Sequence, residues 1–199
     1  MYKIAVMVSG GGTNLQAIID AIEQGDLQNV EIAVVVSTNH HAYALQRAKN
    51  HGIDTAVFAK KDFDSRAARE AALMRLLKVK QVQLVVLCGC LMVFSEEFVK
   101  VFEKRIINVH PALLPNFGGK GFYGLAVHEA VLAAGAAKTG ATVHFVDGGI
   151  DTGEIILQKQ VAILAGDTPE TLQRRVMQEA EWIILPQAIG LLAKGDFKS

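Results

Sequence analysis

The sequence predicts an α/β protein whose mostly parallel sheet is flanked by helices and is followed by an antiparallel hairpin and a long final helix. Three observations indicate this fold. In the first half, short runs that are apolar throughout alternate with segments of helical periodicity, which is typical of parallel strands buried on both faces. In the second half, a turn-rich connection joins two strand-like segments, which favours a hairpin. A Thr-Pro pair then opens the last helix, with Thr168 as its N-cap and Pro169 at the first helical position.

The elements of the first half begin with a strand over 3–8. A glycine-rich turn leads from it into a helix over 15–22, where Thr13 and Gln16 predict a capping box. The following segments continue the alternation: a strand over 31–37, a helix over 41–51, a strand over 55–58, a helix over 65–79 that Asp62 or Asp64 caps, a strand over 84–88, a short helix from Ser95, and a strand over 105–109. This order predicts a Rossmann-like arrangement for the first half.

The second half begins after His110 with a loop that contains two prolines and four glycines. A helix over 126–134 follows, then the hairpin strands over 139–146 and 154–163. Pro186 is expected to kink or break the final helix, because proline has no backbone N–H. No repeat, linker or low-complexity segment interrupts the chain. We therefore expect a single domain over 1–199, with halves at 1–110 and 111–199.

Composition excludes several classes of protein. Lys and Arg number 20, as do Asp and Glu, so the formal net charge is zero and no basic stripe favours a nucleic-acid partner. Cys88 and Cys90 are too few for a disulfide framework and lack a second ligand pair for zinc. The longest apolar run, 85–94, is far shorter than the ~20 residues that span a bilayer. With no secretory signal at the N-terminus, we expect a soluble, cytoplasmic protein without a metal, a membrane partner or a nucleic-acid partner.

The glycine-rich turn Gly10-Gly11-Gly12 matches neither of two common nucleotide-binding patterns. The dinucleotide pattern fails, because Leu15 stands where a third glycine is needed and the second strand ends without an acidic residue. The Walker pattern fails as well. The remaining interpretation is a turn that directs N–H groups at one phosphate of a small substrate, with Thr13 and Asn14 adding donors. The alternative is an ordinary turn between a strand and a helix.

Asn108 and His110 form the second candidate group. They are two residues apart at the carboxyl end of a strand, so their side chains point to the same side. Pro111 favours extended geometry at His110 and so preserves this alternation. An amide beside an imidazole can stabilise a developing oxyanion and move a proton, as acyl transfer requires. The alternative is a polar strand end without a chemical role.

The segment 142–153 carries the third group. Asp147 and Asp151 are interpreted first as turn residues. If Asp151 faces His110 instead, its charge raises the pKa of the imidazole and keeps it protonated near neutrality. His144 is interpreted as a buried or hydrogen-bonded strand histidine and not as a catalyst.

Five segments, in this order, resemble the phosphoribosylglycinamide formyltransferases of purine biosynthesis, over nearly the whole chain. They are the segments at 9–17, 63–66, 107–115, 143–146 and 150–153. The resemblance implies that a formyl group passes from 10-formyltetrahydrofolate to the amine of phosphoribosylglycinamide. The amine attacks directly through a tetrahedral intermediate, and no metal is needed.

The resemblance also implies a role for individual residues. The catalytic set is Asn108, His110 and Asp151. The ribonucleotide would be bound by Gly12, Thr13, Asn14, Gln178 and Glu181. The folate would be bound by Arg66, Leu91, Met92, Val93, Phe94, Asn108, Gly148, Gly149 and Ile150. On this assignment, 1–110 is the ribonucleotide-binding half, and 111–199 holds the folate loop and the C-terminal half.

The sequence departs from the family pattern in two places. The family often has Phe-Met-Arg-Ile-Leu where this chain has Cys-Leu-Met-Val-Phe at 90–94, and we expect altered side-chain contacts there. The loop over 116–124 is longer than usual, and its Lys120 is a further candidate for the phosphate.

Three alternatives stay open at this point. A methionyl-tRNA formyltransferase would need a nucleic-acid-binding domain and a basic surface, for which 199 neutral residues leave no room. A formyltetrahydrofolate hydrolase would need a regulatory domain before the first strand, where this chain starts. A non-catalytic nucleotide-binding module would use the glycine turn without His110. The oligomeric state is expected to be a monomer or a homodimer.

Overall fold

The computed structural model describes residues 1–197. The chain divides into two compact units, Met1–Ile107 and Asn108–Ser199. The division falls within strand β5 (Ile106–His110), close to the boundary predicted at residue 110. A single domain over 1–199 stays a prediction, and the two units are described separately below.

The first unit is built on a parallel sheet. Its strands are β1 (Tyr2–Val8), β2 (Val30–Ser37), β3 (Thr55–Val57) and β4 (Leu84–Cys88), in the order β3-β2-β1-β4, and each neighbouring pair is parallel. All five residues from Ile4 to Val8 are fully buried. Burial on both faces explains why the strand is apolar throughout rather than alternating. The predicted parallel sheet is confirmed.

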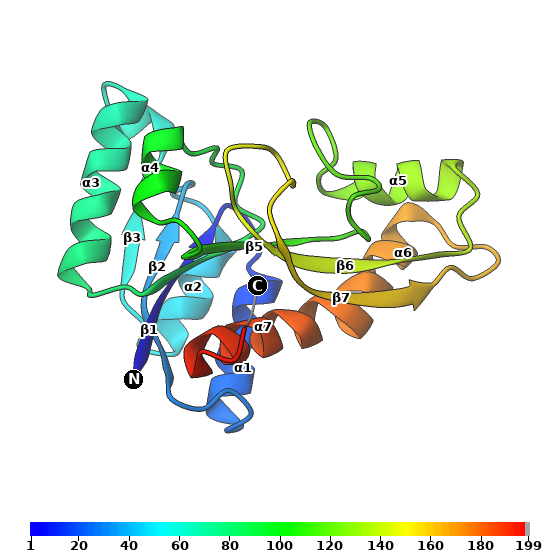
Figure 1. Ribbon diagram of the computed structural model, residues 1–199, viewed down its shortest axis with the longest axis horizontal. Helices are drawn as coiled ribbons and strands as arrows, with labels where there is room; N and C mark the ends of the chain where they lie inside the picture. The colour runs from blue at the N-terminus through cyan, green and yellow to red at the C-terminus, as the bar shows by residue number, and fades with distance from the viewer. Residues whose placement is uncertain (198–199) are drawn as a thin grey trace. The chain divides into compact units, whose positions relative to one another are not determined.

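Four α-helices and one 3₁₀ turn complete the first unit. They are α1 (Thr13–Glu23), α2 (Tyr43–Asn50), the turn η1 (Lys60–Asp62), α3 (Arg66–Val79) and α4 (Glu96–Val101). Figure 1 shows α3 and α4 next to each other, and a hydrogen bond from the Ser95 backbone N to Glu70 links their first turns.

The caps of two helices differ from the prediction. Helix α1 has no capping box at Thr13, because its N-cap is Gly12 in the left-handed region (φ 73°). A Cβ at Gly12 would lie 2.5 Å from that of Ala44, so only glycine fits this turn. Helix α3 is capped by Ser65, whose hydroxyl accepts from the Ala68 N–H at 3.1 Å. Asp62 and Asp64 are not the cap, because Ser65 directly precedes the first helical residue.

The second unit contains the hairpin and the final helices. After the end of β5 come α5 (Leu125–Ala133), β6 (Lys138–Phe145), β7 (Ile155–Ala162), α6 (Pro169–Val176), the π-helix η2 (Met177–Glu181) and α7 (Trp182–Lys194). Strands β6 and β7 are antiparallel, as predicted, and Figure 1 shows them as one long ribbon of two strands. Helix α7 and η2 pack against both strands. The predicted fold class is therefore confirmed.

The final helix begins as predicted but continues differently. Thr168 caps it in a capping box with Thr171, and Pro169 is the first helical residue. Pro186 neither ends nor breaks α7, which runs through it to Lys194. Pro186 has no N–H for the Trp182 carbonyl, and the segment that precedes α7 is the π-helix η2. None of the helices within residues 1–197 is long and apolar enough to cross a membrane.

Candidate active site

The end of β5 presents a carboxamide and an imidazole. Asn108 is half-buried and His110 is 3% exposed. Because alternate side chains of a strand share a face, both project to one side of the second unit. The Nδ2 of Asn108 lies 3.2 Å from the Nε2 of His144, which brings a third polar side chain into the group.

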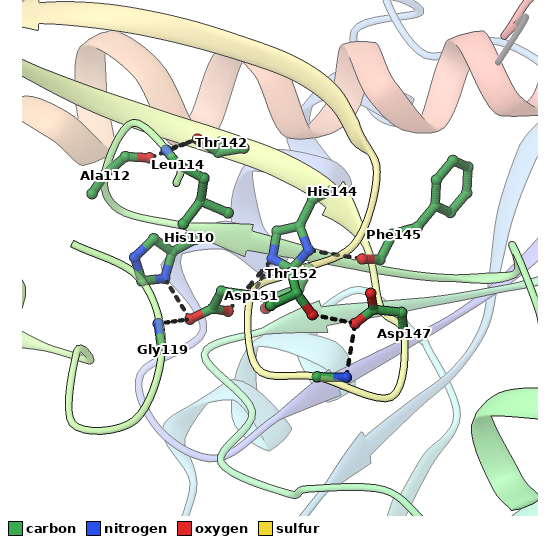
Figure 2. Close-up of polar contacts among 12 residues, drawn as sticks. His110, Ala112, Leu114, Gly119, Thr142, His144, Phe145, Asp147, Asp151 and Thr152 are labelled. Atoms are coloured by element: carbon green, nitrogen blue, oxygen red, sulfur yellow. Dashed lines mark hydrogen bonds and ion pairs between the residues drawn. The ribbon is translucent and has the colours of Figure 1, made fainter. Parts of the chain in front are cut away.

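Asp151 lies between the two histidines (Figure 2). One carboxylate oxygen is 3.5 Å from the Nδ1 of His110, and the other is 3.5 Å from the Nε2 of His144. The backbone N–H of Gly119 donates to the first of these oxygens at 3.0 Å. Asp151 has φ 57°, in the left-handed region that aspartate tolerates better than most residues. The structure thus brings together Asn108, His110 and Asp151, all within the second unit.

The protonation of His110 is set by opposing influences. Its Nε2 donates to the carbonyl oxygen of Phe117 at 2.7 Å, and its Nδ1 faces Asp151. Burial is the largest influence and lowers the pKa of His110, while the Phe117 carbonyl and the Asp151 charge raise it. The net direction is downward. The predicted effect of Asp151 on the pKa has the right sign, but burial outweighs it, so the expected net rise in the pKa of His110 is not found.

Asp151 itself is held in its charged form. Burial tends to raise its pKa, but the contact with His144, the hydrogen bond from the Gly119 N–H and the charges of the nearby imidazoles lower it overall. A carboxylate that stays ionised beside a buried imidazole can balance a positive charge that forms on the ring. His110, with Asp151 beside it, can therefore take a proton from a reacting group or give one to it.

His144 is more closely involved than the sequence indicated. It is buried and hydrogen-bonded, as predicted, since its Nδ1 donates to the Phe145 carbonyl at 2.8 Å. In the neutral ring this leaves the Nε2 lone pair to accept from Asn108. His144 therefore orients the Asn108 amide, and its Nε2 also lies 3.5 Å from Asp151. In the sequence, the two-residue spacing of Thr142 and His144 indicated that both side chains lie on one face of a strand. It could not indicate that His144 contacts Asn108.

Asp147 shapes the loop that carries Asp151. Its carboxylate accepts from the Gly149 N–H at 2.9 Å and from the Thr152 hydroxyl at 2.7 Å, as a turn residue does. The predicted folate residues Gly148, Gly149 and Ile150 are exposed on this loop, and Ile150 is 49% exposed. An exposed apolar side chain here suits contact with a ligand ring.

The glycine turn of the first unit is anchored by α2. The Gly10 carbonyl accepts from the Ala44 N–H at 3.1 Å, and the Gly11 carbonyl accepts from the Nε of Arg47 at 2.9 Å. Gly12 immediately precedes α1, whose first residues are Thr13 and Asn14. The first N–H groups of a helix have no partner within it and carry positive partial charge, which suits an anion.

Arg47 adds a full positive charge to this turn and was missed by the sequence analysis. Its guanidinium also donates to Gln16 at 3.0 Å and lies over the Tyr43 ring, 5.1 Å from the centroid. The periodicity of 41–51 predicted a helix, but it could not show which turn an arginine on that helix would meet.

Arg66, one of the predicted folate residues, bonds to a buried carboxylate that also accepts from Ser95. Glu70 accepts from the Nε of Arg66 at 3.0 Å and from both the backbone N–H, at 2.9 Å, and the hydroxyl of Ser95. These bonds lower the pKa of Glu70 although burial opposes them. They tie the start of α3 to the end of the segment 91–95, beside a cavity of about 550 Å³ that Arg66 and Glu70 line. In that segment Met92 and Phe94 are buried, whereas Leu91 and Val93 are exposed.

The remaining predicted residues are placed as follows. Gln178 is exposed and Glu181 is buried, and both belong to the π-helix η2 of the second unit. Wide helical turns of this kind occur often at functional sites. Lys120 is exposed on the loop over 116–124. Within residues 1–197, no group of three or more His, Cys, Asp or Glu side chains is placed to hold a metal ion, and the absence of a metal stays a prediction.

Comparison with known proteins places this arrangement among formyl transferases. The family described as "Formyl transferase" matches residues 2–189. The chain is 43% identical over 195 residues to the trifunctional purine biosynthetic protein adenosine-3 of Drosophila pseudoobscura pseudoobscura, which covers 97% of this chain and 14% of that protein. It is 42% identical over 177 residues to the chloroplastic phosphoribosylglycinamide formyltransferase of Vigna unguiculata, covering 89% and 56% of the two chains. The chain thus spans only a part of either protein.

Solved structures agree with these relatives. The glycinamide ribonucleotide transformylase 1 of Symbiobacterium toebii has a TM-score of 0.90 and 42% sequence identity, over 98% of this chain and 89% of that one. A phosphoribosylglycinamide formyltransferase of Coxiella burnetii, in complex with CHES, has a TM-score of 0.89 and 39% identity, over 97% and 87%.

Proposed function

The chain belongs to the formyl transferase family, and on that premise we propose that it transfers the formyl group of 10-formyltetrahydrofolate to the amine of phosphoribosylglycinamide. The proposal takes the substrate from the names of its relatives. It takes the chemistry from Asn108, His110 and Asp151 in the second unit. The observation that carries it is the Asp151 carboxylate 3.5 Å from the Nδ1 of His110, with the Asn108 amide on the same strand end.

The proposed reaction uses these three side chains. The amine nitrogen attacks the formyl carbon, a new C–N bond forms, and the formyl oxygen gains negative charge. One N–H of Asn108 and the Nδ1–H of protonated His110 donate to that oxygen. The bond from the formyl carbon to the folate nitrogen then breaks, and that nitrogen takes up a proton while the former amine loses one. His110 can carry this proton, because Asp151 balances the charge on its ring.

Proximity supplies much of the remaining rate. Two substrates held with their reacting atoms in contact behave as one molecule, and effective molarities of about 10⁵ M or more are reached in such cases. We propose that Gly12, Thr13 and Asn14 bind the phosphate, helped by the α1 N-terminus and by Arg47. Gln178 and Glu181 complete the ribonucleotide contacts in this proposal, with Lys120 as a further candidate.

The folate assignment is likewise part of the proposal. Arg66 offers a cation for an acidic group, and the exposed Leu91 and Val93 offer apolar contacts. The loop with Gly148, Gly149 and Ile150 supplies the contacts from the second unit. Met92 and Phe94 are buried, so we assign their contribution to the main chain. A cytoplasmic protein that is a monomer or a homodimer, without a nucleic-acid partner, completes the proposal.

A thermal-shift panel tests the substrate class. Ligand that binds the native state alone stabilises it by about 2.7 kcal/mol at one hundred times its dissociation constant. We expect phosphoribosylglycinamide to raise the melting temperature in a concentration-dependent way, and tRNA or NAD to leave it unchanged. Stabilisation by tRNA alone would favour a tRNA formyltransferase. Stabilisation by nucleotides in general, without formyl transfer, would favour a binding module.

A further inference from the structure

The extended loop over 116–124 contacts both members of the catalytic pair through its main chain. The Phe117 carbonyl accepts from the Nε2 of His110 at 2.7 Å, and the Gly119 N–H donates to Asp151 at 3.0 Å. Figure 2 shows the bond from Gly119 and the neighbouring contact between His110 and Asp151. All of these residues belong to the second unit.

The backbone of this loop is shaped for these contacts. Phe117 has φ 54°, which a non-glycine residue adopts only where its surroundings impose it. Its ring packs edge-on against Phe122, with the centroids 6.4 Å apart. At Gly118, an added Cβ would lie 2.5 Å from the Cδ2 of Leu114 and 3.4 Å from the Cβ of Asp151. The loop at Gly118 therefore packs closely against Leu114 and Asp151, and this packing determines its position.

The two main-chain groups have opposite polarity, and each faces the charge that it stabilises. A carbonyl oxygen points at the ring that becomes cationic, and an N–H points at the carboxylate. In agreement, the Phe117 carbonyl raises the pKa of His110, and the Gly119 N–H lowers the pKa of Asp151. Both contacts favour the charged pair over the neutral one.

The first contact also fixes which nitrogen reacts. Because Nε2–H is committed to the Phe117 carbonyl, a neutral His110 carries its proton on Nε2, and Nδ1 is the nitrogen beside Asp151. Only the protonated ring carries an Nδ1–H, and because the 3.5 Å between Nδ1 and Asp151 exceeds an ordinary hydrogen-bond length, that N–H can donate to an incoming oxygen.

We propose that the loop over 116–124 is a main-chain clamp, in which Phe117 holds His110 with Nδ1 as the reacting nitrogen and Gly119 holds Asp151 beside it. Phe117 and Gly119 are positioning residues that touch no reacting atom. The clamp's role in catalysis rests on the proposed function, whereas its contacts do not.

The tautomer of His110 tests the clamp in the free protein. We expect nitrogen-15 NMR, at a pH where His110 is neutral, to show the proton on Nε2 and a bare Nδ1, with the signal assigned by its loss in His110→Gln. A neutral ring with its proton on Nδ1 would overturn the proposal. This measurement needs no substrate, so it decides the clamp whether or not the protein transfers formyl groups.

A matched pair of glycine variants tests the second contact. Gly119 and Gly121 have φ 94° and 95°, and an added Cβ meets nothing within 4 Å at either position. Alanine therefore strains the backbone equally at both positions, but of these two glycines Gly119 is the one that donates to Asp151.

We expect Gly119→Ala to lower kcat about tenfold, less than the roughly 10²–10⁴-fold that a positioned acid–base group itself contributes, because Gly119 acts through Asp151. We also expect it to move the His110 limb of the rate–pH profile to lower pH, with the KM of both substrates changed less than about twofold. Gly121→Ala should leave the profile in place. Identical profiles for the two variants would overturn the clamp, whereas a wild-type protein without formyl transfer would overturn the proposed function instead.

Discussion

The Nδ1 of His110 lies 3.5 Å from a carboxylate oxygen of Asp151, and no other described acidic side chain forms an ion pair with this ring. Asp151 reaches this position from a loop after β6, with its backbone in the left-handed region. The carboxylate is close enough to balance a cationic ring and too far to occupy its N–H fully. This one relationship supports both roles assigned to His110, stabilising a negative oxygen and moving a proton.

Replacing Asp151 by asparagine tests that relationship with little disturbance of the backbone, because asparagine also tolerates φ 57°. The Asp151 charge raises the pKa of His110, so its loss lowers that pKa further. Activity that depends on the protonated ring disappears as pH rises through this pKa, and in Asp151→Asn it should disappear at lower pH. The kcat measured between about pH 5 and 9 checks this. If the rate–pH profile of Asp151→Asn has the same apparent pKa values as the wild type, Asp151 acts only as a turn residue.

Glu70 is expected to act on folate binding alone. In Glu70→Gln the acceptor loses its negative charge, so the ion pair with Arg66 is lost and the bonds from Arg66 and Ser95 go to a neutral amide, which weakens each by about 1 kcal/mol. We expect the KM for 10-formyltetrahydrofolate to rise about tenfold and the KM for the ribonucleotide to stay within about twofold. Glu97→Gln, an exposed residue at the same cavity, is the control. If the KM rises equally for both substrates, Arg66 and the segment 91–95 do not form a site specific for the folate.

Arg47 is expected to act on the phosphate. Arg47→Gln removes the cation that holds the Gly11 carbonyl, so binding of phosphoribosylglycinamide should weaken about tenfold. The dephosphorylated ribonucleoside should bind with nearly the same affinity to the variant and to the wild type, as calorimetry can show. Lys49→Gln, which removes an exposed charge from the same helix, controls for net charge. A loss that is equal with and without the phosphate would contradict the assignment of the glycine turn.

His128 predicts a specific pH dependence of stability. It is fully buried on α5, and neither ring nitrogen has a partner within residues 1–197, so burial, with the charge of His110, lowers its pKa from 6.5 to about 4. Between these values the unfolded chain binds a proton that the folded chain does not. Stability is therefore fully present above pH 6.5 and is lost as pH falls toward 4, by about 3 kcal/mol.

Urea unfolding at several pH values between 4 and 7.5 measures this loss. We expect His128→Leu to lose less of its unfolding free energy over this window than the wild type, because the variant has no group there to protonate. His41→Leu, at an exposed histidine, should behave as the wild type does. If the wild type and His128→Leu lose the same free energy, His128 is charged in the folded state.

The parts of the fold that the sequence predicted correctly are those set by local pattern. The buried strands β1 and β4 were recognisable because both of their faces are apolar, and Thr168 was recognisable because a cap residue directly precedes a proline. The cap of α1 was wrong, because the approach of Ala44 to Gly12 decides it, and that contact is not local. The expectation that Pro186 breaks the final helix was also wrong, because α7 runs through the proline and packs against β6 and β7.

The candidate site divides in the same way. The period of two in β5 placed Asn108 and His110 on one side, and the resemblance supplied Asp151. The support for these side chains comes from main-chain groups and from distant strands: the Phe117 carbonyl, the Gly119 N–H and His144. A backbone carbonyl carries no residue-specific signal, so no pattern could have indicated that Phe117 meets His110. The net direction of the His110 pKa depends on burial, which only the packed structure provides.

Formyl transfer by the purified protein, measured beside His110→Ala, tests the central claim most directly. With 10-formyltetrahydrofolate and phosphoribosylglycinamide at saturating concentrations, we expect the wild type to produce formylglycinamide ribonucleotide and His110→Ala to be slower by about 10²-fold or more. Either a wild type that transfers no formyl group, or a His110→Ala variant that turns over at nearly the wild-type rate, would contradict the account.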